Sequence, residues 1–141
     1  AVKATNRFEA TRDKVQKYLN AKHREEIIFT KGATEAINLV ASSYGKKYIK
    51  KGDEVLITEL EHHSNYVPWN FLRTEKGAAI KFAQVNEGGD VEIEEIKKLI
   101  TNKTKMIAIT HISNVTGAVL PITKIVDLAK EKNISKKEMK Y

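Results

Sequence analysis

The chain has 141 residues, 41% of them hydrophobic and 30% charged, which suffices for one folded domain and excludes a disordered polar segment. It contains no cysteine, which excludes disulfides, thiolate metal sites and a cysteine nucleophile within these residues. The formal net charge of +7 is spread along the sequence without an arginine-rich or aromatic-interleaved motif, so nucleic acid is not an expected partner.

No apolar run approaches the roughly 20 residues that a membrane-spanning helix needs, and the N-terminus has no signal-peptide pattern. We therefore expect a cytoplasmic protein without a membrane partner. The first residue is Ala1 rather than methionine, and we expect that the chain begins inside a longer protein.

Helical and strand patterns alternate from the beginning of the chain. Apolar residues recur at helical spacing over residues 6–21, which predicts an amphipathic helix. The β-branched and aromatic run 26–30 predicts a strand, which leads into the glycine turn 31–34. A second helix is expected to begin at this turn and to end near Lys50.

The second half of the chain continues this alternation. Further strands are predicted at residues 54–58, 78–83 and 105–110. Further helices are predicted between Pro68 and Gly77, at about 93–100 and at about 121–132. The strand at 105–110 is almost continuously apolar, so it is expected to be buried on both faces, as parallel strands under helices are. The alternation predicts an α/β fold, with the strand order left open.

The turn that follows the first predicted strand could bind an anion. Residues 30–34, Thr-Lys-Gly-Ala-Thr, combine a glycine and a threonine at a helix N-terminus, where free backbone amides point outward. The turn lacks a Walker loop and the repeated glycines of a dinucleotide site, so a single phosphate suits it better than a nucleotide. An ordinary glycine turn with a threonine cap explains this segment equally well when it is taken alone.

Polar loops follow two further predicted strands. The loop at 58–69 carries His62 and His63, and the loop at 111–117 carries Asn114. Loops at the carboxyl ends of parallel strands meet at one edge of the sheet, so we expect them to share a binding cleft with the glycine turn. For a histidine pair alone, a solvated polar turn is the simpler interpretation; the neighbouring motifs favour chemistry at the histidine loop.

No metal site is expected, although four potential ligands crowd the histidine loop: Glu59, Glu61, His62 and His63. Adjacent side chains in an extended chain point to opposite sides, so the two histidines would chelate one ion badly. No two histidines have the spacing of one helical turn either.

These motifs together resemble the class V aminotransferase group of fold type I pyridoxal 5′-phosphate enzymes, which contains the cysteine desulfurases. Residues 59–69, Glu-Leu-Glu-His-His-Ser-Asn-Tyr-Val-Pro-Trp, resemble the histidine signature of the SufS type. Residues 29–41 are similar to its phosphate segment, and residues 110–117 to its next cofactor segment. The resemblance implies an incomplete three-layer α/β/α sheet of the transferase large domain.

The resemblance also implies a pyridoxal 5′-phosphate site. Ala33 and Thr34 would bind the cofactor phosphate, and Asn114 would form a hydrogen bond on the side of the ring that carries the hydroxyl group. His62 would stack on the pyridine ring and act as the catalytic residue, because a histidine can relay protons near neutral pH.

The implied function is that of part of a cysteine desulfurase. Its parent would convert L-cysteine to L-alanine and pass the sulfur, as a persulfide on an enzyme cysteine, to an acceptor protein for iron–sulfur cluster assembly. L-selenocysteine is an alternative substrate, as in selenocysteine lyases, and a homodimer is implied for the parent.

The sequence departs from the family near its end. Residues 1–133 are expected to form a partial cofactor-binding domain, and residues 134–141 a divergent tail. Family members continue with an aspartate for the pyridinium nitrogen and a Ser-x-His-Lys segment with the Schiff-base lysine, and neither is found here. We therefore expect the chain alone to be inactive. The alternative is a noncatalytic module that binds a phosphate, a cofactor or another protein.

Overall fold

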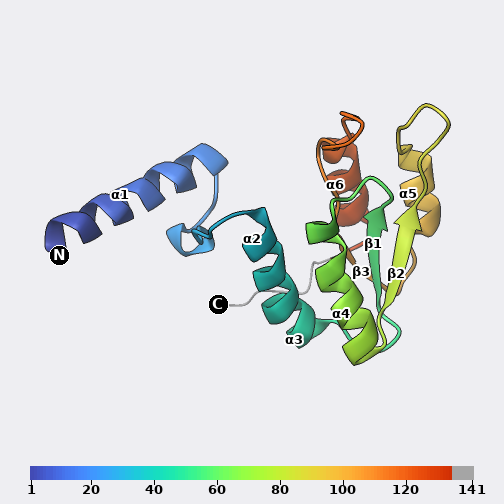
Figure 1. Ribbon diagram of the computed structural model, residues 1–141, viewed down its shortest axis with the longest axis horizontal. Coiled ribbons are helices and arrows are strands. Elements are labelled where there is room, and N and C mark those ends of the chain that lie inside the picture. Colours follow the sequence, from blue (N-terminus) through green and yellow to red (C-terminus); the bar gives the residue numbers. More distant parts are fainter. Residues whose placement is uncertain (135–141) are drawn as a thin grey trace. The chain divides into compact units, whose positions relative to one another are not determined.

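The computed structural model describes residues 1–134 and divides the chain into two compact units, Ala1–Gly32 and Ala33–Tyr141 (Figure 1). The divergent tail that the sequence predicts at 134–141 lies, except for Ile134, outside the described residues. The cofactor-binding residues that the sequence predicts all belong to the second unit.

The first unit consists of a long helix and a short one. Helix α1 (Val2–Leu19) confirms the predicted amphipathic helix, and a 3₁₀ turn, η1 (Arg24–Glu26), follows it. Phe8 packs edge-on against Phe29 with 5.1 Å between the ring centroids. The Arg12 guanidinium lies 5.2 Å and 5.3 Å from the centroids of these two rings, so cation–π contacts join α1 to the segment after η1.

The prediction of a strand at residues 26–30 is wrong. Glu26 ends η1, and residues 27–30 pair with no strand among the described residues. A β-branched run forms a strand only where a neighbouring strand bonds its backbone groups. Here Arg12 donates a hydrogen bond to the Ile27 carbonyl instead, and Ile28 remains 64% exposed.

The second unit contains a parallel sheet in the order β2-β1-β3. The strands β1 (Glu54–Thr58), β2 (Ala79–Ala83) and β3 (Thr104–Ile107) confirm the other three predicted strands, although β3 ends earlier than expected. All five residues of β1 are buried, because this strand lies in the middle of the sheet. In β3 only Thr104 is buried, so the expectation of burial on both faces is wrong for a strand that borders the described sheet.

The remaining elements are helical. The second predicted helix is divided into α2 (Ala33–Val40), the π-helical turn η2 (Ala41–Gly45) and α3 (Lys46–Tyr48). The others are η3 (His63–Asn65), α4 (Val67–Lys76), α5 (Ile93–Leu99) and α6 (Ile122–Glu131). Pro68 lies in the first turn of α4, and Gly77 ends that helix at φ 71°, as the sequence predicts. None of the described helices is both long and apolar enough to cross a membrane.

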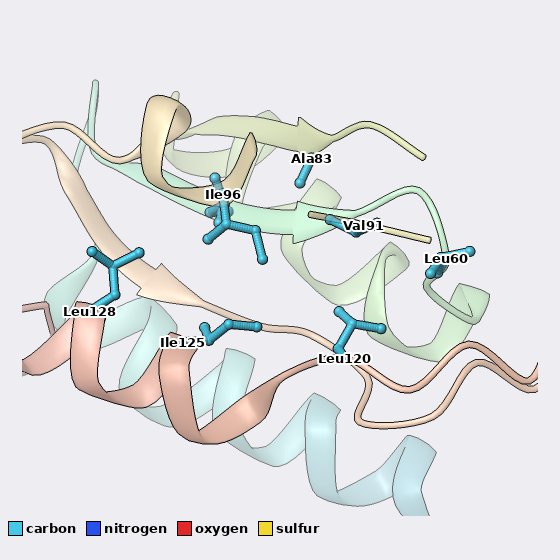
Figure 2. Packing of buried hydrophobic residues seen from close by; sticks show 8 residues of the cluster. Leu60, Ala83, Val91, Ile96, Leu120, Ile125 and Leu128 are labelled. Atoms are coloured by element: carbon cyan, nitrogen blue, oxygen red, sulfur yellow. The ribbon is translucent and has the colours of Figure 1, made fainter. Parts of the chain in front are cut away.

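Helices cover both faces of the sheet, which confirms the three-layer α/β/α fold. On one face Leu56 of β1 packs with Ile96 of α5 and with Ile125 and Leu128 of α6, as Figure 2 shows for the helical residues. On the other face, the neighbours of Leu56 in β1 pack with buried residues of η2 and α4; this cluster consists of Ala41, Ile49, Val55, Ile57, Trp69, Leu72 and Ala78. The alternation along β1 therefore divides the core into two layers.

Candidate functional site

A cleft of about 740 Å³ lies where the loops after β1 and β3 meet the start of α2. The residues that line it come from these three segments and from the end of β3: Ala33, Thr34, Ile37, Glu61, His62, Ser64, Asn65, Ile107, Ala108, Ile109, Thr110 and Asn114. All four predicted cofactor-binding residues are among them. His63 instead lines a separate cavity of about 320 Å³.

The start of α2 brings anion-binding groups to the cleft. Ala33 and Thr34 are the first two residues of this eight-residue helix, and both are exposed. The first amides of an α-helix have no acceptor within the helix, and the helix dipole places partial positive charge there. The backbone amides and the Thr34 hydroxyl can therefore donate hydrogen bonds to an anion in the cleft.

The histidine loop holds the His62 ring by one nitrogen. His62 Nδ1 accepts a hydrogen bond from the Ser64 backbone N–H at 3.1 Å and lies 2.9 Å from Ser64 Oγ. A backbone amide can only donate, so Nδ1 is an acceptor and the neutral ring carries its proton on Nε2. The ring is exposed, which leaves it accessible to a ligand in the cleft.

The two adjacent histidines are oriented differently. Their ring planes are inclined by 88°, with 6.3 Å between the centroids. Within residues 1–134, no group of three or more histidine, cysteine, aspartate or glutamate side chains is arranged to hold a metal ion.

The loop that carries Asn114 is shaped by its neighbour Ser113. Ser113 is 3% exposed, and its Oγ accepts hydrogen bonds from the backbone N–H groups of Val115 and Thr116 at 3.3 Å and 3.2 Å. Gly117, at φ 76°, allows the chain to turn back, and its N–H donates to the Ser113 carbonyl at 3.0 Å. These bonds leave the Asn114 side chain exposed at the cleft.

The sequence favours chemistry at the histidine loop, but it considers Glu61 individually only as a possible metal ligand and does not reveal how Glu61 and Asn65 hold the loop. Both side chains line the cleft, and the amide of Asn65 donates a hydrogen bond to the Glu61 carboxylate at 2.7 Å. The same carboxylate accepts a hydrogen bond from the backbone N–H of Thr110, 49 residues away. No local pattern signals this bond, because its partners belong to different loops.

The groups in the cleft fit pyridoxal 5′-phosphate. Ala33 and Thr34 provide donors for a phosphate, His62 provides a flat ring that can stack on a pyridine, and Asn114 provides an amide for a ring hydroxyl. A volume of about 740 Å³ is ample for a ligand of this size.

The chain matches the family model described as aminotransferase class-V over residues 1–135. It therefore belongs to the class V aminotransferase family. Several curated relatives are named as cysteine desulfurases or probable cysteine desulfurases. The chain is 46% identical over 129 residues to a probable cysteine desulfurase of a Synechocystis strain. That match covers 92% of this chain and 31% of the relative, so the chain spans about a third of the relative's length.

Two further comparisons agree. A probable cysteine desulfurase of Staphylococcus aureus is 51% identical over 114 residues, which are 81% of this chain and 28% of the relative. The crystal structure of a cysteine desulfurase from Escherichia coli superposes with a TM-score of 0.86 at 33% identity, over 95% of this chain and 34% of that chain. The three-layer fold described above is thus shared with cysteine desulfurases.

Proposed function

We propose that the chain supplies one part of the pyridoxal 5′-phosphate site of a cysteine desulfurase of the SufS type. The observation that carries this proposal is the cleft, which brings together Ala33, Thr34, His62 and Asn114 from three segments distant in the sequence. The class V family and its cysteine desulfurase relatives support the cofactor and the reaction.

Each residue has a distinct role in this proposal. Ala33 and Thr34 bind the phosphate through backbone amides and the threonine hydroxyl, and Asn114 binds the ring hydroxyl side. His62 stacks on the pyridine ring and, with Nδ1 bonded to Ser64, presents its Nε2 proton for transfer. When bound, pyridoxal 5′-phosphate supplies an electron sink for the electron pair that remains after an α-proton is removed.

The proposed reaction of the whole enzyme converts L-cysteine to L-alanine. The carbon–sulfur bond of the substrate breaks, and its sulfur forms a bond to an enzyme thiolate as a persulfide, so no external oxidant or reductant is consumed. The 141 residues contain no cysteine, so the persulfide would form on a residue outside them. We assign residues 1–133 to the cofactor-binding domain and residues 134–141 to a divergent tail.

The wider role follows the family. We propose that the persulfide passes to an acceptor protein for iron–sulfur cluster assembly, that the whole enzyme is a cytoplasmic homodimer, and that L-selenocysteine is an alternative substrate. A related solved structure, with a TM-score of 0.85 at 28% identity, is described as a complex with cysteine, which supports cysteine as the substrate class.

The test is a titration of the 141-residue chain with pyridoxal 5′-phosphate and with pyridoxal, which lacks the phosphate. We expect weak, reversible binding of the first and weaker binding of the second. Thr34→Val removes one donor to the phosphate, and a lost hydrogen bond of about 1 kcal/mol raises the dissociation constant about fivefold. The affinity for pyridoxal should not change.

Thr74→Val is the matched control, because Thr74 lies on α4 away from the cleft and donates its hydroxyl hydrogen to the Asn70 carbonyl at 3.0 Å. It should bind pyridoxal 5′-phosphate as the unaltered chain does. Equal binding of pyridoxal and its phosphate ester, or equal losses in the two variants, would contradict the phosphate site.

A further inference from the structure

We infer that Glu61 is a positioning residue whose carboxylate clamps the histidine loop to the end of β3 and thereby sets His62 and Asn114 relative to each other in the cleft. The inference rests on the proposed function for the identity of the ligand. The contacts that support it lie entirely within the second unit and do not depend on a ligand.

The Glu61 carboxylate receives donors from three places in the fold. Thr58 Oγ1, at the end of β1, donates to Oε1 at 2.7 Å, and the backbone N–H of Thr110 donates to the same oxygen at 2.9 Å. Asn65 Nδ2, at the end of η3, donates to Oε2 at 2.7 Å. An ionised carboxylate accepts all three bonds at once, whereas a carboxamide offers only one accepting oxygen.

A second bond strengthens the clamp on the other side of His62. Asn65 Nδ2 also donates to the Ala108 carbonyl at 3.1 Å. Asn65 is itself held from the core, because Trp69 Nε1 donates to its Oδ1 at 3.0 Å and Trp69 is 2% exposed. The residues before and after the segment 62–64 are therefore both bonded to the chain that leaves β3.

This arrangement couples the two loops that carry the proposed ligands. His62 directly follows Glu61, and Asn114 lies four residues after Thr110 in a loop whose start is fixed by a bond from Thr110 Oγ1 to the Ile112 carbonyl at 2.8 Å. A change in the bond between Glu61 and Thr110 therefore moves both loops relative to each other. Glu61 acts through these neighbours and needs no contact with the reacting atoms.

Glu59 offers a matched control two residues earlier. Its Oε2 accepts the backbone N–H of Val85 at 2.9 Å, so it ties the loop after β1 to the chain that leaves β2. It lines the cavity beside His63 and does not line the 740 Å³ cleft. Glu59→Gln thus weakens the bond to Val85, which is comparable to the bond between Glu61 and Thr110. It joins β1 to the β2 side of the sheet, whereas the bond of Glu61 joins β1 to the β3 side.

The experiment compares the unaltered chain with Glu61→Gln and Glu59→Gln. Hydrogen exchange is measured by mass spectrometry on the ligand-free chain, and the dissociation constant and circular dichroism band of added pyridoxal 5′-phosphate are measured afterwards. For Glu61→Gln we expect exchange in residues 61–66 and 108–114 to rise about tenfold, with a weaker and altered dichroism band and about fivefold weaker binding. Glu59→Gln should affect only residues 83–86.

The outcomes separate this inference from the proposed function. If both variants lower the thermal midpoint equally and only Glu61→Gln alters the cofactor band, the role in positioning is supported. If Glu61→Gln shows the same hydrogen exchange in residues 108–114 and the same cofactor dichroism band as Glu59→Gln, the inference is overturned. If even the unaltered chain binds no cofactor, the proposed function fails in this chain. Hydrogen exchange in residues 108–114 then decides alone whether Glu61 joins the two loops.

A second variant covers the case in which Glu61→Gln does not fold. Glu61→Asp keeps the carboxylate but shortens the side chain by one methylene group, so it should fold while it weakens the bond to Thr110. We expect an intermediate rise of exchange in residues 108–114 with this variant. Exchange there at the rate of the unaltered chain would overturn the inference.

Discussion

Lys81 on β2 forms an ion pair with Glu54 on β1, with 3.2 Å between Nζ and Oε1. Glu54 is only 8% exposed, and the hydroxyls of Thr101 and Thr104 donate to its Oε2 at 2.6 Å and 3.1 Å. Burial alone would raise the pKa of Glu54, but the hydrogen bonds and the Lys81 charge together lower it below its ordinary value of 4.5. This pair stabilises the start of the sheet, away from the cleft.

This lowered pKa predicts a loss of stability in acid. The carboxylate contributes stability above the pKa of the unfolded state, and the contribution disappears as the pH falls through that value toward the lower folded pKa. Glu54→Gln should lower the free energy of unfolding near pH 7 by about 1.5–3 kcal/mol, because it removes hydrogen bonds to a charged group. Urea unfolding of both proteins at several pH values between about pH 3 and 7 measures this difference in the free energy of unfolding. Parallel pH curves for the two proteins would contradict it.

Gly45, at the end of the π-helical turn, allows α4 to pack closely. A Cβ at this position would lie 2.7 Å from Leu72 Cδ1, and Leu72 is 1% exposed. Overpacking costs about 1–3 kcal/mol of folding free energy, whereas alanine is favoured over glycine in a helix by only about 0.5–1 kcal/mol. We therefore expect Gly45→Ala to destabilise the chain by about 1 kcal/mol.

A double-mutant cycle tests the cause of this loss. The three atoms nearest to the added methyl group all belong to the Leu72 side chain and are absent in a Leu72→Ala background, so Gly45→Ala should be neutral or stabilising there. Urea unfolding of all four proteins gives the coupling free energy. An equal loss in both backgrounds would attribute the effect to the backbone of the π-helical turn rather than to Leu72.

The sheet was predictable because its strands carry their signals locally. β1 matches its predicted bounds, and β2 begins one residue later than expected, since each is an apolar run between turn residues. Residues 26–30 have the same local character, yet whether they form a strand depends on a neighbouring strand that a sequence pattern cannot locate. The earlier end of β3 likewise depends on the bonds that Glu61 and Asn65 make with Thr110 and Ala108.

The gathering of the site was also predictable, because parallel strands place their following loops at one edge. The sequence indicated that Thr34, His62 and Asn114 would share a cleft, and all three line it. The loops of His62 and Asn114 do follow the parallel strands β1 and β3, whereas Thr34 reaches the cleft at the start of α2 although no strand forms at 26–30. What it could not indicate is how the loops are held. The bond from the Thr110 amide to Glu61 joins residues 49 positions apart, and a backbone donor of this kind leaves no trace in side-chain periodicity.

The two adjacent histidines should differ in their effect on cofactor binding. His62 lines the cleft and His63 does not. Loss of an aromatic contact worth about 0.5–1.5 kcal/mol predicts that His62→Ala binds pyridoxal 5′-phosphate about two- to tenfold more weakly. His62→Phe should retain most of the affinity, because it keeps a flat ring, and His63→Ala should bind normally. A loss in His63→Ala as large as that in His62→Ala would exclude a specific stacking role for His62.

The 141-residue chain should associate with itself. The loop after β3 exposes several apolar side chains: Ile112 at 56%, Val115 at 82% and Val119 at 63%. β3 also borders the described sheet, with residues that are only partly buried. Apolar patches and open strand edges favour contact between copies, so light scattering should show a mass that rises with concentration and falls in Val115→Lys. A compact monomer at all concentrations would favour an independent module instead.

The purified 141-residue chain should not desulfurate cysteine. The proposed reaction needs a thiolate to receive the sulfur, and the chain contains no cysteine. None of its lysines stands in the Ser-x-His-Lys context that the resemblance assigns to the Schiff base. Either lack should be disabling. The proposed contacts of Ala33, Thr34, His62 and Asn114, which line the cleft, should still hold the cofactor loosely.

The measurement combines the chain, pyridoxal 5′-phosphate and L-cysteine, and compares the alanine and sulfide produced with those from the cofactor alone. Borohydride treatment followed by peptide mass mapping then shows whether any lysine holds the cofactor covalently. We expect no alanine above the background and only scattered labelling of exposed lysines, because a specific adduct requires a lysine held beside the cleft, and none lines it among residues 1–134. Turnover above the background, or a stoichiometric adduct on one lysine, would show that these 141 residues contain a complete catalytic site.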